Sequence, residues 1–210
     1  MTRALALFDF DGTLISGDSI VFYTRFARKK GWMRWSEYVK AGLHAVGYLL
    51  GRENEEQSKN HALAFRRRMT EADRAALDRA FADWLLRRVY PAARGCMEAH
   101  RQAGRTLLLV TASPACYMDI VGESLGFDAV LATPMTDGAA VHHNCKGEEK
   151  VRRVRQWLET TGIEADFSDS YAYGDSKSDL PMLRLCGHPT LVNPKKSLTK
   201  AAPDLPRAKW

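Results

Sequence analysis

Short apolar runs recur along the chain, and segments with helical periodicity separate them. The runs occupy residues 4–10, 106–111, 128–132, 170–173 and 189–193. A run of this kind, with little polar content, is typical of a strand that is buried on both faces of a sheet. We therefore predict five buried strands.

Helical patterns lie between these runs. Residues 91–104 end in a glycine, as helices often do, and Val151, Val154 and Leu158 recur at helical spacing. Alternating strands and helices favour a parallel sheet with helices on both faces. We predict an α/β fold with a Rossmann-like three-layer core, a mostly parallel sheet and an inserted helical cap.

The predicted insertion follows the first strand, because residues 16–89 carry no strand signal. Thr70 is a candidate N-cap for an amphipathic helix that contains Leu77 and Phe81. Residues 31–50 are aromatic-rich and mostly helical in pattern, interrupted by glycines at 42 and 47. We expect a core of residues 1–15 and 90–210 and a cap of residues 16–89.

Composition narrows the protein class. The chain has 210 residues, 45% of them hydrophobic and 27% charged, with a net charge of +6. This composition is ordinary for a globular protein, and the mild positive charge favours an anionic ligand without indicating nucleic acid. Four scattered cysteines without a CxxC pair indicate reduced thiols, so we expect a cytoplasmic protein. No apolar run approaches the ~20 residues that a membrane span needs.

Acidic side chains follow two of the predicted strands. Asp9 and Asp11 end the first, and Asp175 ends the fourth, while Thr111 ends the second. Because the carboxyl ends of parallel strands meet at one edge of a sheet, we expect these residues to converge. Two or three carboxylates suit Mg²⁺, whereas zinc would require histidine or cysteine.

These residues carry a family resemblance. The segment Asp9-Phe10-Asp11-Gly12-Thr13, then Thr111, then Lys146 or Lys150, then the segment from Gly174 to Asp179 look like the four motifs of the haloacid-dehalogenase-like phosphatase superfamily. A helical cap just after the first motif resembles the phosphoserine-phosphatase-like branch. The resemblance covers nearly the whole chain and implies a phosphatase that requires Mg²⁺.

The resemblance also implies roles for the two leading acids. Asp9 would be the nucleophile that forms an aspartyl-phosphate. Asp11 would act as general acid and then as general base, while its carbonyl helps Asp9 and Asp175 to bind Mg²⁺. Asp179 would support the metal shell or the lysine.

Phosphate binding and charge neutralisation are expected from two further segments. Thr111, with the backbone N–H groups of Ala112 and Ser113, would hold the phosphoryl oxygens. Lys150 is the favoured catalytic lysine, and Lys146 is the alternative. Asp18 stands where some phosphoserine phosphatases carry a glutamate that contacts the substrate amine, so it is a candidate cap contact.

The expected substrate is a small phosphomonoester, phosphoserine-like or histidinol-phosphate-like. A lipid-phosphate or nucleotide phosphatase and a phosphotransferase are alternatives, and a non-enzymatic binding module is disfavoured by the intact acids. We predict no nucleic-acid partner, because the basic run of residues 66–68 is typical of a solvated helix face. Residues 32–50 are expected to form the core of the cap, with a lipid or partner contact left open; the oligomeric state is not predicted.

Overall fold

A parallel sheet of six strands forms the centre of the computed structural model, which describes residues 2–210. Every neighbouring pair in this sheet is parallel. β2 lies inside the sheet, where Leu7 is opposite Leu108 of β3 on one side and Ala172 of β8 on the other. The strands, in order across the sheet, are β10 (Arg207–Ala208), β9 (His188–Val192), β8 (Tyr171–Gly174), β2 (Leu5–Phe8), β3 (Thr106–Pro114) and β4 (Ala129–Thr133).

The five predicted strands are confirmed, and β10 was not predicted. Its two residues, Arg207 and Ala208, form an edge strand, and no apolar run in the sequence predicts a strand there. Two further pairs are equally short. They are β1 (Thr2–Arg3) with β7 (Glu164–Ala165), and the antiparallel pair β5 (Met135–Thr136) with β6 (Ala140–Val141).

Helices cover both faces of the sheet, and the alternation of side chains along β2 assigns each residue to a face. Ala6 and Phe8 pack in one apolar cluster with α5 (Pro91–Gln102) and α6 (Ala115–Leu125). Leu5 and Leu7 pack in the second cluster. The helices that contribute to it are α7 (Glu148–Thr161), α8 (Leu180–Leu185) and α9 (Lys196–Ala201). The predicted three-layer α/β core is confirmed.

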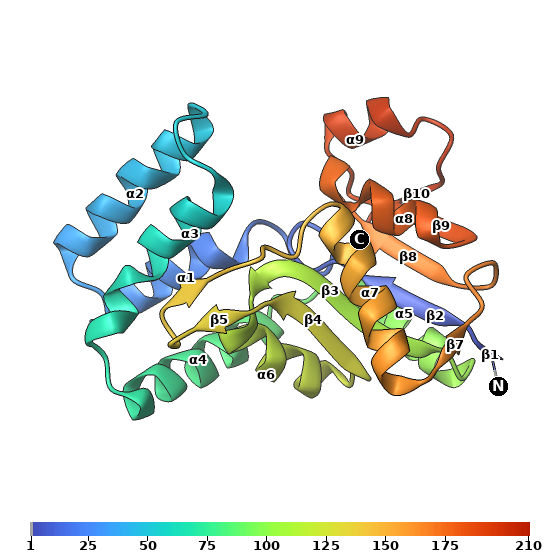
Figure 1. The fold of residues 1–210 in the computed structure, drawn as a ribbon, viewed down its shortest axis with the longest axis horizontal. Helices are drawn as coiled ribbons and strands as arrows, with labels where there is room; N and C mark the ends of the chain where they lie inside the picture. Colours follow the sequence, from blue (N-terminus) through green and yellow to red (C-terminus); the bar gives the residue numbers. More distant parts are fainter. Residues whose placement is uncertain (1) are drawn as a thin grey trace.

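Residues 16–89 contain helices in the structure, and we call them the cap segment. Helices α2 and α3 stand clear of the sheet at one end of the molecule, at left in Figure 1. A single-turn helix, η2 (Lys177–Asp179), lies outside this segment. The cap segment contains α1 (Ser19–Lys29), α2 (Trp35–Leu49), α3 (Glu55–Leu63), the 3-10 helix η1 (Ala64–Arg68) and α4 (Glu71–Leu86).

The structure corrects two expectations about α2. The helix runs without a break through Gly42 and Gly47, since packing against α3 offsets the ~1 kcal/mol that each glycine costs in a helix. Most of the aromatic-rich stretch is also not part of the core of the cap, although Met33 is buried there. Trp35 is 62% exposed and Leu49 is 79% exposed, and only Ala41 of this helix is buried.

A buried ion pair stabilises the interior of the cap segment. The guanidinium of Arg66 donates to both carboxylate oxygens of Asp78, at 2.6 and 2.9 Å, and the Tyr23 hydroxyl donates to Asp78 at 2.6 Å. Arg66 therefore faces this carboxylate and not solvent, contrary to the expectation of a solvated basic run at this residue. None of the helices within residues 2–210 is both long and apolar enough to cross a bilayer.

Candidate active site

The carboxyl ends of β2, β3 and β8 open onto one cavity of about 360 Å³. Polar side chains are found at these ends because the chain leaves the apolar interior of the sheet there. All of the site residues predicted above line the cavity, namely Asp9, Asp11, Asp18, Thr111, Ala112, Ser113, Lys146, Lys150, Asp175 and Asp179. The convergence expected at this edge of the sheet is therefore present in the structure.

Asp9 is buried at the end of β2, and both of its carboxylate oxygens accept hydrogen bonds. Oδ1 accepts from Lys150 Nζ at 2.6 Å, and Oδ2 accepts from Thr13 Oγ1 at 3.2 Å. Burial raises the pKa of Asp9 to about 8; the charge of Asp179 adds to this rise, and Lys150 opposes it. The carboxylate is fixed in orientation and requires further positive charge to stay ionised at neutral pH.

Lys150 lies between two acids in the first turn of α7. Its Nζ is 2.7 Å from Asp179 Oδ1, in addition to its contact with Asp9, and its side chain is fully buried. Burial lowers the pKa of Lys150, but the charges of Asp179 and Asp9 raise it overall. In turn, Lys150 holds the pKa of Asp179 below its ordinary value despite burial. Lys150 is thus a charged ammonium aimed at the candidate nucleophile.

Lys146 lies elsewhere in the cavity wall. Its ammonium pairs with Glu55 of α3, and 39% of its side chain is exposed. It touches neither Asp9 nor Asp179 among the contacts of the described residues. Of the two candidate lysines, Lys150 is the one that contacts the acids.

Asp11 is held by two serines. Its Oδ1 accepts from the Ser19 backbone N–H at 2.8 Å, and its Oδ2 accepts from the Ser113 and Ser19 hydroxyls at 2.5 and 3.0 Å. Burial raises the pKa of Asp11 to about 7 and the charge of Asp18 adds to the rise, whereas the hydrogen bond from Ser113 lowers it. A carboxyl group with such a pKa can give and take a proton at neutral pH.

The end of β3, from Thr111 to Ser113, lies beside these acids. Thr111 is buried, and its Oγ1 accepts from the Ser113 backbone N–H at 3.1 Å. The carbonyl oxygen of Ala112 accepts from Lys59 Nζ at 2.8 Å. Ser113 therefore presents its hydroxyl to Asp11, while its N–H is engaged by Thr111.

Asp175 follows β8 and approaches the first loop closely. A β-carbon at Gly12, whose φ is +80°, would lie 2.3 Å from Asp175 Oδ2, so only glycine allows the two loops to meet. Asp175 Oδ2 also pairs with Lys195 Nζ at 2.7 Å. Burial raises the pKa of Asp175, and the hydrogen bond from Lys195 opposes this rise.

The donor set fits a hard divalent cation. Asp9, Asp175 and Asp179 are buried, and each offers a carboxylate oxygen within 4.8 Å of the others. Asp179 is already engaged by Lys150 and by the backbone and hydroxyl of Ser176. Asp9 and Asp175, with the adjacent Asp11 carbonyl, are the oxygen ligands that suit Mg²⁺.

Asp18 has a local structural role as well as a place in the cavity wall. Its Oδ1 accepts from the backbone N–H groups of Ile20 and Val21 at 3.0 and 3.4 Å, so it is the N-cap of α1. Its position in the wall keeps it within the candidate substrate site.

Several residues of the site were not predicted from the sequence, among them Ser19, Glu55, Lys59 and Lys195. Lys59 comes from α3 and bonds the Asn144 Oδ1 atom at 2.8 Å as well as the carbonyl of Ala112. Glu55 pairs with Lys59 at 2.6 Å and with Lys146. On the cap side of the cavity only Asp18 was predicted, because an isolated lysine on a helix, such as Lys59, carries no motif. Only the N-cap pattern of Asp18 and Ser19 could have directed attention to α1.

Comparison with known proteins identifies relatives that are hydrolases and phosphatases. A model of the family described as haloacid dehalogenase-like hydrolase matches residues 6–184. The chain is 29% identical to a histidinol-phosphatase of Neisseria meningitidis serogroup C over 212 residues, which cover 96% of each chain. It is also 28% identical over 211 residues to the phosphoserine phosphatase SerB1 of Mycobacterium tuberculosis, covering 95% of this chain and 68% of that one.

Solved structures share the fold. A Bordetella pertussis protein of unknown function superposes with a TM-score of 0.88 at 27% identity, over 99% of this chain and 98% of the other. A substrate-bound phosphoserine phosphatase superposes with a TM-score of 0.64 at 18% identity, over 98% of this chain and 92% of that one.

Proposed function

The chain belongs to the haloacid dehalogenase-like hydrolase family and is a phosphatase, and from this premise we propose that it hydrolyses a small phosphomonoester through an aspartyl-phosphate on Asp9, with Mg²⁺ as cofactor. One observation carries the proposal. Asp9, with both carboxylate oxygens hydrogen-bonded, shares a cavity with Asp11, a carboxyl group whose pKa is raised to about 7.

The first half of the reaction transfers the phosphoryl group. A carboxylate oxygen of Asp9 attacks phosphorus, the bond from phosphorus to the ester oxygen breaks, and the proton of Asp11 passes to the leaving alkoxide. Lys150 offsets the charge that develops on the phosphoryl oxygens and on Asp9, and the end of β3 around Thr111 supplies hydrogen bonds to the phosphoryl oxygens. The products are the free alcohol and the phosphorylated Asp9.

The second half returns the enzyme to its starting state. Asp11, now a carboxylate, takes a proton from water as the water oxygen attacks phosphorus, and the bond between phosphorus and Asp9 breaks. The Ser19 and Ser113 hydroxyls, both hydrogen-bonded to Asp11, stabilise its carboxylate form during this step. Inorganic phosphate then leaves the cavity.

Asp9, Asp175 and the Asp11 carbonyl would hold Mg²⁺, which when bound supplies positive charge to the phosphoryl oxygens and to the acidic cluster. The raised pKa values of Asp9 and Asp175 support this assignment, since buried carboxylates without enough positive charge retain protons. Lys195, paired with Asp175, is the side chain that must yield space or share the carboxylate when an ion binds.

Two observations bear on the leaving group. The names of the curated relatives favour phosphorylated amino acids or amino alcohols, since one is named for histidinol phosphate and one for phosphoserine. The cap segment of this chain contains an apolar groove, which favours an apolar leaving group. The proposal for the reaction is common to both, because each substrate is a phosphomonoester.

The test is phosphate release from p-nitrophenyl phosphate by the intact chain, with Mg²⁺ and with chelator. We expect turnover that chelator abolishes and Mg²⁺ restores. Asp9→Asn should lower kcat by at least about 10³-fold, because an amide is not a nucleophile for phosphorus. Asp83→Asn, which alters an exposed aspartate of α4 outside the cavity, is the matched control and should keep full activity.

Turnover that persists in chelator, or in Asp9→Asn, would contradict the proposed mechanism. A folded wild-type chain with Mg²⁺ that releases no phosphate from aryl or alkyl phosphates would contradict the proposed reaction itself.

A further inference from the structure

A second cavity, of about 620 Å³, lies within the cap segment beside the catalytic cavity. Helices α1, α2 and α3 form its walls. Toward α2 its lining is apolar, and the side chains there include Trp35, Val39 and Leu49. These three residues are 62%, 41% and 79% exposed, so the cavity is an open groove whose apolar wall has no protein cover within the described residues. A contiguous exposed apolar surface of this kind is typical of a ligand-binding groove or an interaction site.

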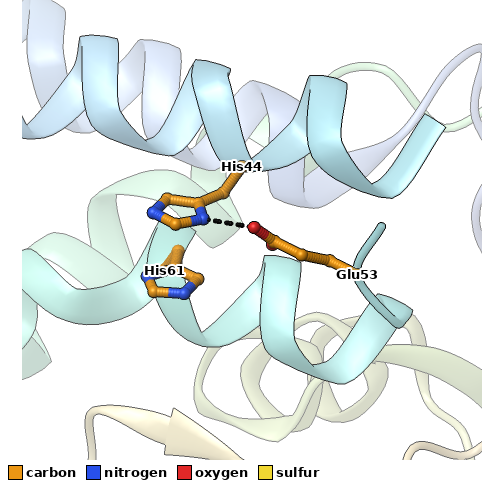
Figure 2. Close-up of side chains that lie close together, drawn as sticks. All are labelled: His44, Glu53 and His61. Atoms are coloured by element: carbon orange, nitrogen blue, oxygen red, sulfur yellow. Dashed lines mark hydrogen bonds and ion pairs between the residues drawn. The ribbon is translucent and has the colours of Figure 1, made fainter. Parts of the chain in front are cut away.

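Contacts of His44 fasten α2 to the chain that follows it, and these contacts hold the helix in place beside the groove. His44 Nδ1 is 2.6 Å from Glu53 Oε1, and the rings of His44 and His61 stack with centroids 3.3 Å apart at 4° (Figure 2). Each of these three side chains offers one possible ligand atom, and the three atoms lie close enough together to bind a metal ion. However, a metal lies in the plane of each imidazole that binds it, and parallel stacked rings do not aim at one point. We interpret the cluster as packing between α2 and α3.

The two cavities share a charged boundary. Residues of both cavities include Asp18, Ile20, Glu55, Lys59, Lys146 and Lys195. Lys59, Lys146 and Lys195 supply positive charge here, and Glu55 pairs with the first two. A ligand that spans the boundary would meet acids, lysines and the candidate nucleophile at one end and apolar side chains at the other. An amphiphile with an anionic head and an apolar tail has this complementary pattern.

The size of the groove also argues against a leaving group as small as serine. Its volume lies within the range of about 300–1,000 Å³ that holds drug-sized ligands. A serine-like group would stay at the charged boundary and leave the wall formed by Trp35, Val39 and Leu49 in contact with water. A chain of several methylene groups would cover that wall, and each buried methylene contributes ~0.8 kcal/mol.

We propose that the groove in the cap segment binds the apolar chain of the substrate, so that the preferred substrate is the phosphomonoester of an amphiphilic alcohol with an alkyl tail. The inference rests on the proposed phosphatase function. It assigns the specificity of that reaction to α2, because the helix lies outside the catalytic cavity and contributes the apolar wall.

The experiment measures kcat/KM for a series of n-alkyl phosphates from ethyl to octyl phosphate, below their micelle-forming concentrations and with Mg²⁺. We expect kcat/KM to rise about two- to fourfold for each added methylene until the groove is filled, which is the gain that burial of one methylene gives. Octyl phosphate should therefore exceed ethyl phosphate by at least about tenfold.

Two variants of α2 localise the effect. Val39→Asp places a charge in the apolar wall, and it should reduce the ratio of octyl to ethyl kcat/KM by about tenfold or more. Leu43→Asp is the matched control, because Leu43 is 66% exposed on the same helix but lines neither cavity. That variant should keep the wild-type ratio. Both positions are exposed, so neither substitution creates a buried charge.

Three results would overturn the inference. The first is equal kcat/KM across the series with brisk turnover of ethyl phosphate, which leaves the phosphatase function intact. The second is an equal loss of the octyl preference in Val39→Asp and Leu43→Asp. The third is a dimer, seen by light scattering, that both variants dissociate, because the apolar face then belongs to a subunit interface. Failure of every phosphate to turn over would instead contradict the proposed reaction.

Discussion

The Lys150 ammonium bridges two carboxylates, with its Nζ atom 2.6 Å from Asp9 Oδ1 and 2.7 Å from Asp179 Oδ1. The three side chains come from the end of β2, the first turn of α7 and η2. One buried cation thereby orients the candidate nucleophile and links the first acidic motif to the fourth. Because all three groups are buried, the ammonium depends on both carboxylates to stay charged, and each carboxylate depends on the ammonium.

This bridge distinguishes the two candidate lysines by experiment. Lys150→Ala should lower kcat/KM by about 10²–10³-fold, since it removes a preorganised charge beside the reacting group. Lys146→Ala, which loses only a half-exposed pair with Glu55, should change it by less than about tenfold. Steady-state kinetics on p-nitrophenyl phosphate, with circular dichroism to verify folding, provides the measurement. A larger loss in Lys146→Ala than in Lys150→Ala would assign the role to Lys146.

Asp11→Asn should separate the two halves of the reaction. The amide cannot supply a proton to an alkoxide, so turnover of ethyl phosphate should fall by about 10²–10⁴-fold. p-Nitrophenolate leaves without a proton, so the first step should survive with that substrate while hydrolysis of the intermediate stalls. We expect a burst of p-nitrophenol and a phosphorylated chain by mass spectrometry. Wild-type turnover without a burst would exclude Asp11 as the acid and base.

The buried pair of Arg66 and Asp78 should stabilise the cap segment. Asp78→Ala leaves the guanidinium, which is 2% exposed, without its carboxylate, and it should lower the free energy of unfolding by about 3–5 kcal/mol. The double variant Arg66→Met with Asp78→Leu removes both charges and should lie closer to the wild type. Urea unfolding measures both. Equal destabilisation by the single and double variants would show that packing, and not the unpaired charge, sets the loss.

His100 should make stability depend on pH. Burial, with a contribution from the charge of Arg105, lowers the pKa of His100 from 6.5 to about 4, and its Nε2 lies 2.8 Å from the Tyr173 hydroxyl oxygen. Between pH 6.5 and pH 4, His100 is therefore protonated in the unfolded chain but not in the folded chain. The contribution of neutral His100 to the free energy of unfolding is fully present above pH 6.5 and is lost as the pH falls toward 4.

The size of this effect is measurable between pH 7.5 and pH 5.5. From the two pKa values, the contribution of His100 to the free energy of unfolding should fall by about 1.3 kcal/mol over this interval. His100→Gln keeps a polar group near Tyr173 and should show a correspondingly smaller fall. Parallel pH profiles of the two proteins in urea unfolding would contradict the assignment.

The fold was predictable where burial leaves a clear sequence pattern. β2 and β3 are continuous apolar runs because both faces of the sheet are covered, and residues 16–89, which lack such runs, contain helices. β10 has two residues at an edge, where nothing forces an apolar pattern. For α2, the apolar residues suggested a core, because the sequence does not reveal whether a helix has a partner on its apolar face.

In the candidate site, the residues at the strand ends were predictable, whereas those that reach the cavity from other segments mostly were not. Asp9, Asp11 and Asp175 follow buried strands, so strand order alone brings them to one edge. Lys59 and Lys195 reach the cavity from helices or loops that tertiary packing positions, and their sequence neighbours carry no sign of this. The choice between Lys146 and Lys150 likewise depends on packing, because Lys150 in the first turn of α7 contacts Asp9, whereas Lys146 precedes the helix and pairs with Glu55.

The two ends of the cap segment meet at a single point, where the Tyr90 backbone N–H donates to the Leu14 carbonyl at 2.9 Å. A stretch that leaves and re-enters the core at one place can be exchanged as one contiguous block of coding sequence, with the sheet and its register unchanged. The seam of such a chimaera should fall after Ser19 and not before it, because Ser19 belongs to the first cap helix yet holds Asp11. A graft that omits this serine would transplant a new leaving-group site and at the same time loosen the acid on which turnover depends.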